Sequence, residues 1–128
     1  MRSSSQLPEV SAASGAERRG VRAWSLALAL GTILIYWPAT QCGFVNFDDD
    51  GYVTANFHVQ RGVTREGVQW AFVSAVNNIW HPLTMLTYMA DYQLYGLKPW
   101  GYHLTNVLLH ALNAALVFVL LRRITGST

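Results

Sequence analysis

The stretch AWSLALALGTILIYWPA, residues 23–39, carries no charged side chain. A helix of this length spans roughly 25 Å, and a few flanking residues bring it to the thickness of a bilayer core. Trp24 and Trp37 lie near its ends, where membrane helices carry an aromatic belt. The long segment before it and the lack of a small-x-small cleavage site after it favour an uncleaved anchor over a secretory signal peptide. The stretch therefore predicts a first membrane-spanning helix.

A second apolar segment, WGYHLTNVLLHALNAALVFVLL, ends at a pair of arginines, and arginines also precede the first segment. By the positive-inside rule, both of these outer ends are expected in the cytoplasm. The chain then divides into a disordered cytoplasmic tail, a first transmembrane helix, an external or periplasmic loop, a second transmembrane helix and a cytoplasmic end that stops early: residues 1–22, 23–39, 40–99, 100–121 and 122–128.

The composition agrees with a membrane class. Hydrophobic residues make up 52% of the chain and charged residues only 12%, whereas soluble domains carry about 25% charged residues. The formal charge of +2 and the lack of a basic cluster interleaved with aromatic residues argue against nucleic acid as a partner. A single cysteine, Cys42, excludes an internal disulfide and a cysteine-based zinc site.

Two amphipathic helices are expected within the loop. In TREGVQWAFVSAVNN, residues 64–78, apolar side chains recur at the spacing of one helix face. In PLTMLTYMADYQLYG, residues 82–96, proline suits the first turn and glycine suits the end. One face of the second helix carries an apolar stripe of ordinary packing residues: Met85, Tyr88, Met89 and Tyr92. The sequence thus predicts an all-α membrane protein.

Three carboxylates, Asp48, Asp49 and Asp50, follow the first span directly. In an extended segment Asp48 and Asp50 would share a face, and crowded like charges are one route to a carboxylate that acts as a base. The alternative is a solvated acidic turn, or a cap for a helix that begins near Tyr52.

Polar residues of the second span form one helical stripe: His103, Asn106, His110 and Asn113. Such groups are costly against lipid, so the stripe should face protein or a wet cavity, as interhelical hydrogen bonds or as part of a site. A shared metal is disfavoured because His103 and His110 are roughly 10 Å apart along the helix axis. His81, between Trp80 and Pro82, fits either a packed corner or a site residue.

Three motifs in order resemble the N-terminal part of a membrane glycosyltransferase family. They are FVNFDDDGYV after the first span, WHPLT before the second loop helix and YHLTNVLLHALNA in the second span. The sequence is similar here to the tetratricopeptide-repeat O-mannosyltransferases and their bacterial relatives, which share the GT-C fold. The resemblance covers residues 44–121 and implies a transferase with many membrane spans. In a bacterium, such a protein is expected in the inner membrane.

The resemblance implies transfer of a sugar from a polyprenyl-phosphate donor to a protein or other hydroxyl acceptor. Asp48 and Asp49 match the acidic pair of the family, one of which acts as general base or orients the acceptor, although Asp50 leaves the alignment open by one residue. Tyr52 matches the aromatic or aliphatic position that follows. Four more residues, with Asp50 and Tyr52, match positions that shape the substrate site: His81, His103, Asn106 and His110. No cofactor is implied, and a divalent metal is left open.

Two features depart from the family pattern. Its members have many more membrane helices, so the missing helices would come from a longer chain or from a partner subunit. No lysine or arginine matches a position for the leaving phosphate, so this chain by itself is expected to be inactive. The alternative function is a non-enzymatic membrane module, in which the polar stripe packs against partner helices and the aspartates cap a turn.

Overall fold

The computed structural model describes residues 15–126, and within them the chain is helical. The elements are α1 Gly15–Tyr36, η1 Trp37–Gln41, η2 Asp50–Thr54, α2 Phe57–Gln60, α3 Arg65–Val73, α4 Pro82–Tyr95 and α5 Pro99–Thr125. Extended pairing in this range is limited to one bridge between Val76 and Ile79. The all-α prediction is therefore confirmed.

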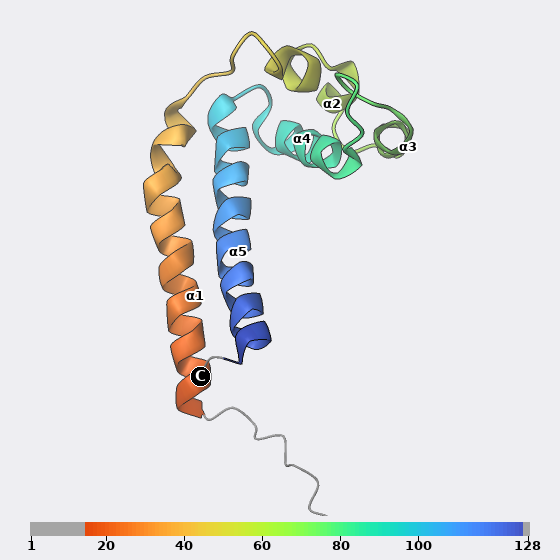
Figure 1. The fold of residues 1–128 in the computed structure, drawn as a ribbon. Helices are drawn as coiled ribbons and strands as arrows, with labels where there is room; N and C mark the ends of the chain where they lie inside the picture. The colour runs from red at the N-terminus through yellow and green to blue at the C-terminus, as the bar shows by residue number, and fades with distance from the viewer. Residues whose placement is uncertain (1–14, 127–128) are drawn as a thin grey trace, which may run out of the picture.

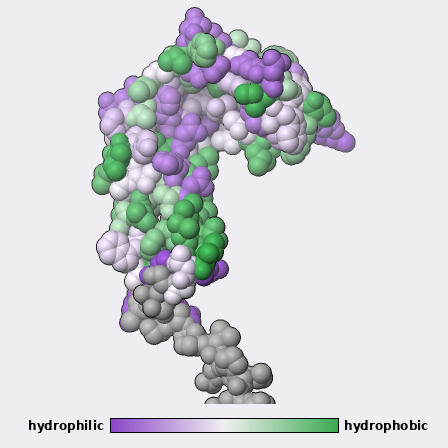
Figure 2. Space-filling model, viewed as in Figure 1, coloured by the Kyte–Doolittle hydropathy of each residue, from purple (hydrophilic) through white to green (hydrophobic). Residues whose placement is uncertain are grey.

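The two long helices, α1 and α5, pack side by side along their length. The first turn of α1 and the last turn of α5, here called their far ends, lie at the same end of the molecule (Figure 1). Residues 18–41 and 99–125 are each long and apolar enough to cross a membrane, and their apolar windows are almost entirely exposed. Figure 2 shows hydrophobic side chains over the lower half of the pair and hydrophilic ones around its upper end. These are the surfaces expected of helices in lipid rather than of a soluble core.

The helices extend beyond the predicted spans. α1 begins at Gly15, so the last residues of the predicted tail, 15–22, are helical, while residues 1–14 lie outside the described part. α5 continues to Thr125 and ends at Gly126, whose φ of 60° is the left-handed conformation that closes many helices. Pro38 follows α1 and lies in the short 3-10 turn η1, because proline cannot supply the N–H of a continuing helix.

Residues 50–95, here called the cap, pack into a small domain at the other end of the helix pair (Figure 1). Its buried centre joins α2, α3 and α4: Val59, Ala71, Met85 and Met89. Asn56 and Thr64 start α2 and α3 by accepting backbone N–H groups with their side chains. α4 runs from Pro82 to a stop at Gly96, as predicted.

Several contacts hold α5 against the cap and against Gly96, the residue that follows it. Thr105 Oγ1 donates to Asp91 Oδ1 at 2.6 Å, and Tyr102 Oη donates to the Gly96 carbonyl at 2.9 Å. Gly101 has no room for a side chain, because a Cβ there would overlap the ring of Tyr95. α4 therefore lies beside the first turns of α5 rather than beyond its end (Figure 1).

The predicted helix over residues 64–78 is wrong in its second half. α3 ends at Val73, and Asn77 and Asn78 both have positive φ, 48° and 63°, in a tight turn closed by the Val76–Ile79 bridge. Asparagine tolerates this conformation better than most residues, and two in succession suit a type I′ turn. Residues 75 and 76 continue the apolar helix spacing, and this spacing led to the longer predicted helix.

Candidate functional site

The three aspartates lie in a turn that enters η2, here called the acidic turn, residues 48–50. Of the two arrangements considered for them, the structure has the turn and not the extended segment, because the Tyr52 N–H donates to the Asp48 carbonyl and the backbone is helical. Successive side chains of a helix diverge by about 100°. Asp48 and Asp50 therefore do not share a face, and each of the three carboxylates has its own surroundings.

Each carboxylate accepts one hydrogen bond through one of its oxygens. Asp48 Oδ1 accepts from Asn77 Nδ2 at 3.3 Å, Asp49 Oδ2 from the Val45 N–H at 2.8 Å, and Asp50 Oδ1 from Thr54 Oγ1 at 2.7 Å. The bonds of Asp49 and Asp50 are local and brace the turn. The hydrogen bond of Asp48 joins two residues that are 29 positions apart in sequence, so it depends on the folding of the cap.

Asn77 reaches the acidic turn because its positive-φ turn lies against Gly51. A Cβ on Gly51 would approach Asn77 Oδ1 to 3.1 Å, which is tighter than ordinary packing. The glycine after the three aspartates thus lets two loops meet. The sequence reading missed Asn77, and the Asn-Asn pair was the signal that could have located this turn.

An aromatic cluster lies under the acidic turn. The ring of Tyr52 is 5.2 Å from His81 and 6.3 Å from Tyr88. Tyr88 in turn lies 6.2 Å from Tyr102, which contacts Phe44 at 5.3 Å. The cluster therefore joins the acidic turn, the start of α4 and the start of α5. It brings Tyr52 and His81, two of the predicted substrate residues, into direct contact.

Electrostatic coupling also reaches the turn. The pKa of Tyr88 is raised, first by burial and then by the negative charge of Asp49, with smaller contributions from Tyr52 and Asp91. Asp49 therefore lies close enough to Tyr88 to interact with it through space. A neutral phenol beside the carboxylates offers a hydrogen-bond donor to a bound hydroxyl or sugar.

A buried carboxylate that the sequence reading missed is Asp91 on α4, with 3% of its surface exposed. Burial raises its pKa, and the hydrogen bond from Thr105 opposes that rise. Asp91 lies three residues after Tyr88, outside the apolar stripe, so the stripe gave no signal that it is buried.

The polar stripe of α5 is divided between different surroundings. His103 is partly buried and its Nε2 has no hydrogen-bond partner, whereas Asn106 and Asn113 are exposed. His110 packs edge-on against Tyr36 of α1, with ring centres 4.9 Å apart. His110 lies roughly 12 Å further along α5 than Tyr102. His110 therefore contacts the neighbouring helix α1 and lies well away from the Tyr102 end of α5.

No group of three His, Cys, Asp or Glu side chains within residues 15–126 is arranged to hold a metal ion. The site of the described chain thus consists of the acidic turn, Asn77, and the aromatic cluster with His81. It combines hydrogen-bond acceptors, a phenol donor and ring faces at one end of two candidate membrane spans. Such an arrangement suits a polar substrate that carries hydroxyl groups.

Three Drosophila melanogaster proteins are similar to this chain. Protein O-mannosyl-transferase Tmtc3 is 33% identical over 98 residues, which is 66% of this chain and 10% of that protein. Protein O-mannosyl-transferase Tmtc2 is 31% identical over 102 residues, 73% of this chain and 11% of that protein. Protein O-mannosyl-transferase Tmtc1 is 39% identical over 54 residues, which is 42% of this chain and 6% of that protein.

The chain thus spans about a tenth of the length of the two relatives with the longer matches. No protein-family model matches the sequence. No solved structure matches it either.

Proposed function

We propose that this chain forms the acceptor side of a membrane glycosyltransferase site, in which a sugar passes from a polyprenyl-phosphate donor to a hydroxyl group of a protein acceptor. The observation that carries the proposal is the position of the acidic turn, on a folded cap at one end of two candidate membrane spans. The similarity to proteins named O-mannosyl-transferases supports the same reaction class.

The proposed reaction uses one carboxylate of the turn as general base. The acceptor oxygen forms a bond to the anomeric carbon while its proton passes to Asp48 or Asp49. The bond between that carbon and the phosphate oxygen breaks, and polyprenyl phosphate leaves with the electron pair. Since each carboxylate uses one oxygen in a described hydrogen bond, the other is the one assigned to the acceptor proton. A positioned base of this kind contributes roughly 10²–10⁴-fold to the rate.

The proposed topology places the cap outside the cytoplasm and the far ends of α1 and α5 inside. The support is the arginine distribution, since Arg18, Arg19 and Arg22 lie at one far end and Arg122 and Arg123 at the other. A lipid-linked donor keeps its tail in the bilayer, so its phosphate and sugar lie at the height of the cap. The helices that complete the site would come from the rest of a longer chain or from a partner.

The test is a chimaera in which this chain replaces the matching segment of the Drosophila Tmtc3 relative, assayed for mannose transfer. Asp48→Asn and Asp49→Asn are each compared with Glu66→Gln, an exposed acidic residue in the first turn of α3. We expect at least one of the two turn variants to lose roughly 10²–10⁴-fold in turnover, with the Glu66 variant unchanged. Full turnover in both aspartate variants would remove the catalytic role of the acidic turn.

A further inference from the structure

The outward side of α4 is an apolar face without charge. Four residues recur three or four positions apart and so share one side of the helix, here called the outer face of α4: Leu83, Thr87, Ala90 and Leu94. Leu83 is 72% exposed and Leu94 is 71% exposed. The one charged residue of α4, Asp91, is buried and faces α5 instead. The outer face therefore presents hydrocarbon to whatever surrounds the cap.

α3 shows how a helix of the same cap is built where it meets water. Its exposed side chains include Arg65, Glu66 and Gln69. Charged and polar side chains of this kind mark the outward side of a helix at an aqueous surface. The outer face of α4 has exposed leucines in their place, so its composition does not suit water.

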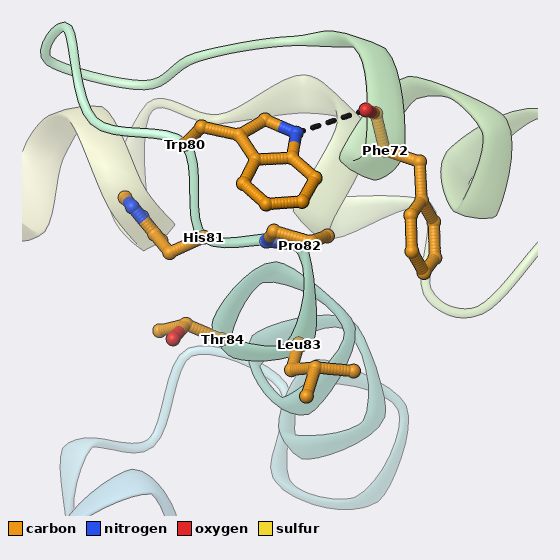
Figure 3. A pocket seen from close by; sticks show the side chains of 6 residues that line it. All are labelled: Phe72, Trp80, His81, Pro82, Leu83 and Thr84. Atoms are coloured by element: carbon orange, nitrogen blue, oxygen red, sulfur yellow. Dashed lines mark hydrogen bonds between the residues drawn. The ribbon is translucent and has the colours of Figure 1, made fainter.

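The polar groups at the outer face already have their hydrogen bonds within the chain. Thr87 Oγ1 donates to the Leu83 carbonyl, one turn earlier, at 2.9 Å. Trp80 lines the same apolar hollow as Leu83, and its indole Nε1 donates to the Phe72 carbonyl at 2.9 Å (Figure 3). A polar group in hydrocarbon must be satisfied within the protein, because lipid tails offer no partner. Both groups meet this condition without water.

The length of α5 sets the level of α4 in the membrane. A hydrocarbon core about 30 Å thick takes up about 20 residues of a helix. Counted from Arg122, in the last turn of α5, these residues reach back to Tyr102. Trp100 lies just beyond that point and is 46% exposed, as expected of a tryptophan at the membrane boundary. Thr105, which donates to Asp91 of α4, lies about 5 Å to the membrane side of Tyr102. α4 is therefore held at the edge of the hydrocarbon.

We propose that the outer face of α4 lies in the hydrocarbon of the leaflet at the cap end of the helix pair, so that its partner is membrane lipid. The cap is then partly embedded, while the charged side of α3 faces water. Figure 2 shows hydrophobic side chains among those at the lower edge of the cap, above the apolar half of the helix pair. The inference goes beyond the proposed function, because it involves no sugar transfer and holds for either orientation of the chain.

The test is the collision accessibility of nitroxide spin labels on the full chain in nanodiscs. Single labels are attached at Leu83→Cys and Leu94→Cys, and the control is Gln69→Cys on α3, each in a Cys42→Ser background. Oxygen dissolves in hydrocarbon, whereas nickel(II) ethylenediaminediacetate stays in water. The ratio of oxygen to nickel collisions should be about tenfold or more higher at positions 83 and 94 than at position 69, because hydrocarbon excludes a polar complex.

Two results would overturn the inference. A ratio at position 83 or 94 no higher than that at position 69 would place the outer face in water. Low collision rates with both reagents would mean that protein covers the face, for example a second copy of the chain. Circular dichroism of the labelled variants establishes that the helices are intact, and both α4 sites are exposed, so a label there needs no room in the core. The outcome is separate from that of the chimaera, which measures sugar transfer.

Discussion

Replacing Met89 with alanine tests whether the cap is a cooperative unit that holds the acidic turn in place. Met89 is fully buried in α4, where it contacts the cluster of Val59, Ala71 and Met85. Its Sδ lies only 3.2 Å from the position that a Cβ on Gly67 would take, so α3 packs directly on it. Truncation therefore leaves a cavity where α2, α3 and α4 meet.

The magnitude follows from the burial. Truncating a buried methionine to alanine destabilises by about 2–5 kcal/mol, because the transfer free energy of the removed atoms and the cavity both contribute. Opening of the cap should then become roughly 30- to 5,000-fold more frequent. α5 makes few contacts with this cluster and runs into the predicted membrane region. Its second half should keep its protection.

Hydrogen–deuterium exchange of the chain in nanodiscs measures this directly. In Met89→Ala, amides of α3 and α4 should exchange faster by the stated factor, while those near the end of α5 stay unchanged. Leu94→Ala is the matched control, because it truncates an exposed side chain of the same helix and should change exchange by less than about threefold. If Met89→Ala resembles that control, the cap is not held by this cluster, and the reasoning about the acidic turn fails with it.

Three further predictions concern single positions. Burial raises the pKa of Asp91 above its ordinary value of 3.8, so this carboxyl ionises less readily in the folded cap than in the unfolded chain. The stability of the cap should therefore fall as the pH rises from 3.8 through the pKa of the folded state. Asp91→Asn should remove this part of the pH dependence, measured as the difference between the urea unfolding curves of variant and parent from pH 3 to 8; an unchanged slope would contradict it. Gly62 has a φ of 73°, and a Cβ there would overlap the stem of Gln93. Gly62→Ala should therefore destabilise the cap by about 1–3 kcal/mol, seen as faster exchange in α4, and unchanged exchange would refute the strain. Asn77→Gly keeps the positive φ but removes the side-chain amide that donates a hydrogen bond to Asp48. Turnover of the chimaera should therefore fall several-fold, while hydrogen–deuterium exchange of the cap stays constant. Full turnover would show that this hydrogen bond does not position Asp48.

Local signals predicted much of the fold. The uncharged residues 23–39 lie within α1 and η1, and α4 could be read from Pro82, Gly96 and the stripe that buries Met85 and Met89. These features depend on neighbours in sequence, which periodicity and capping rules describe. Where such rules competed, the turn chemistry of Asn77 and Asn78 prevailed over an apolar spacing that favoured a longer helix.

The candidate site was less predictable, because its contacts join distant segments. The three aspartates were recognisable, but the partner of Asp48 lies 29 residues away. The hydrogen-bond partner of Asp91 is Thr105, which lies on another helix, α5. The polar stripe of α5 shares one helix face by sequence, yet only the packing of α1 places Tyr36 against His110. Such contacts depend on the tertiary arrangement, which no local rule contains.

The central claim is that the acidic turn lies on the outer side of the membrane. Cys42 tests it most directly, because it is the only cysteine of the chain, is exposed, and lies six residues before Asp48. In intact cells or spheroplasts, an impermeant maleimide should label the parent chain and leave Cys42→Ser unlabelled. Gln69→Cys in the Cys42→Ser background places the same test on an exposed position of α3. Labelling of both thiols before lysis is the expected result, and labelling only after lysis would contradict the account.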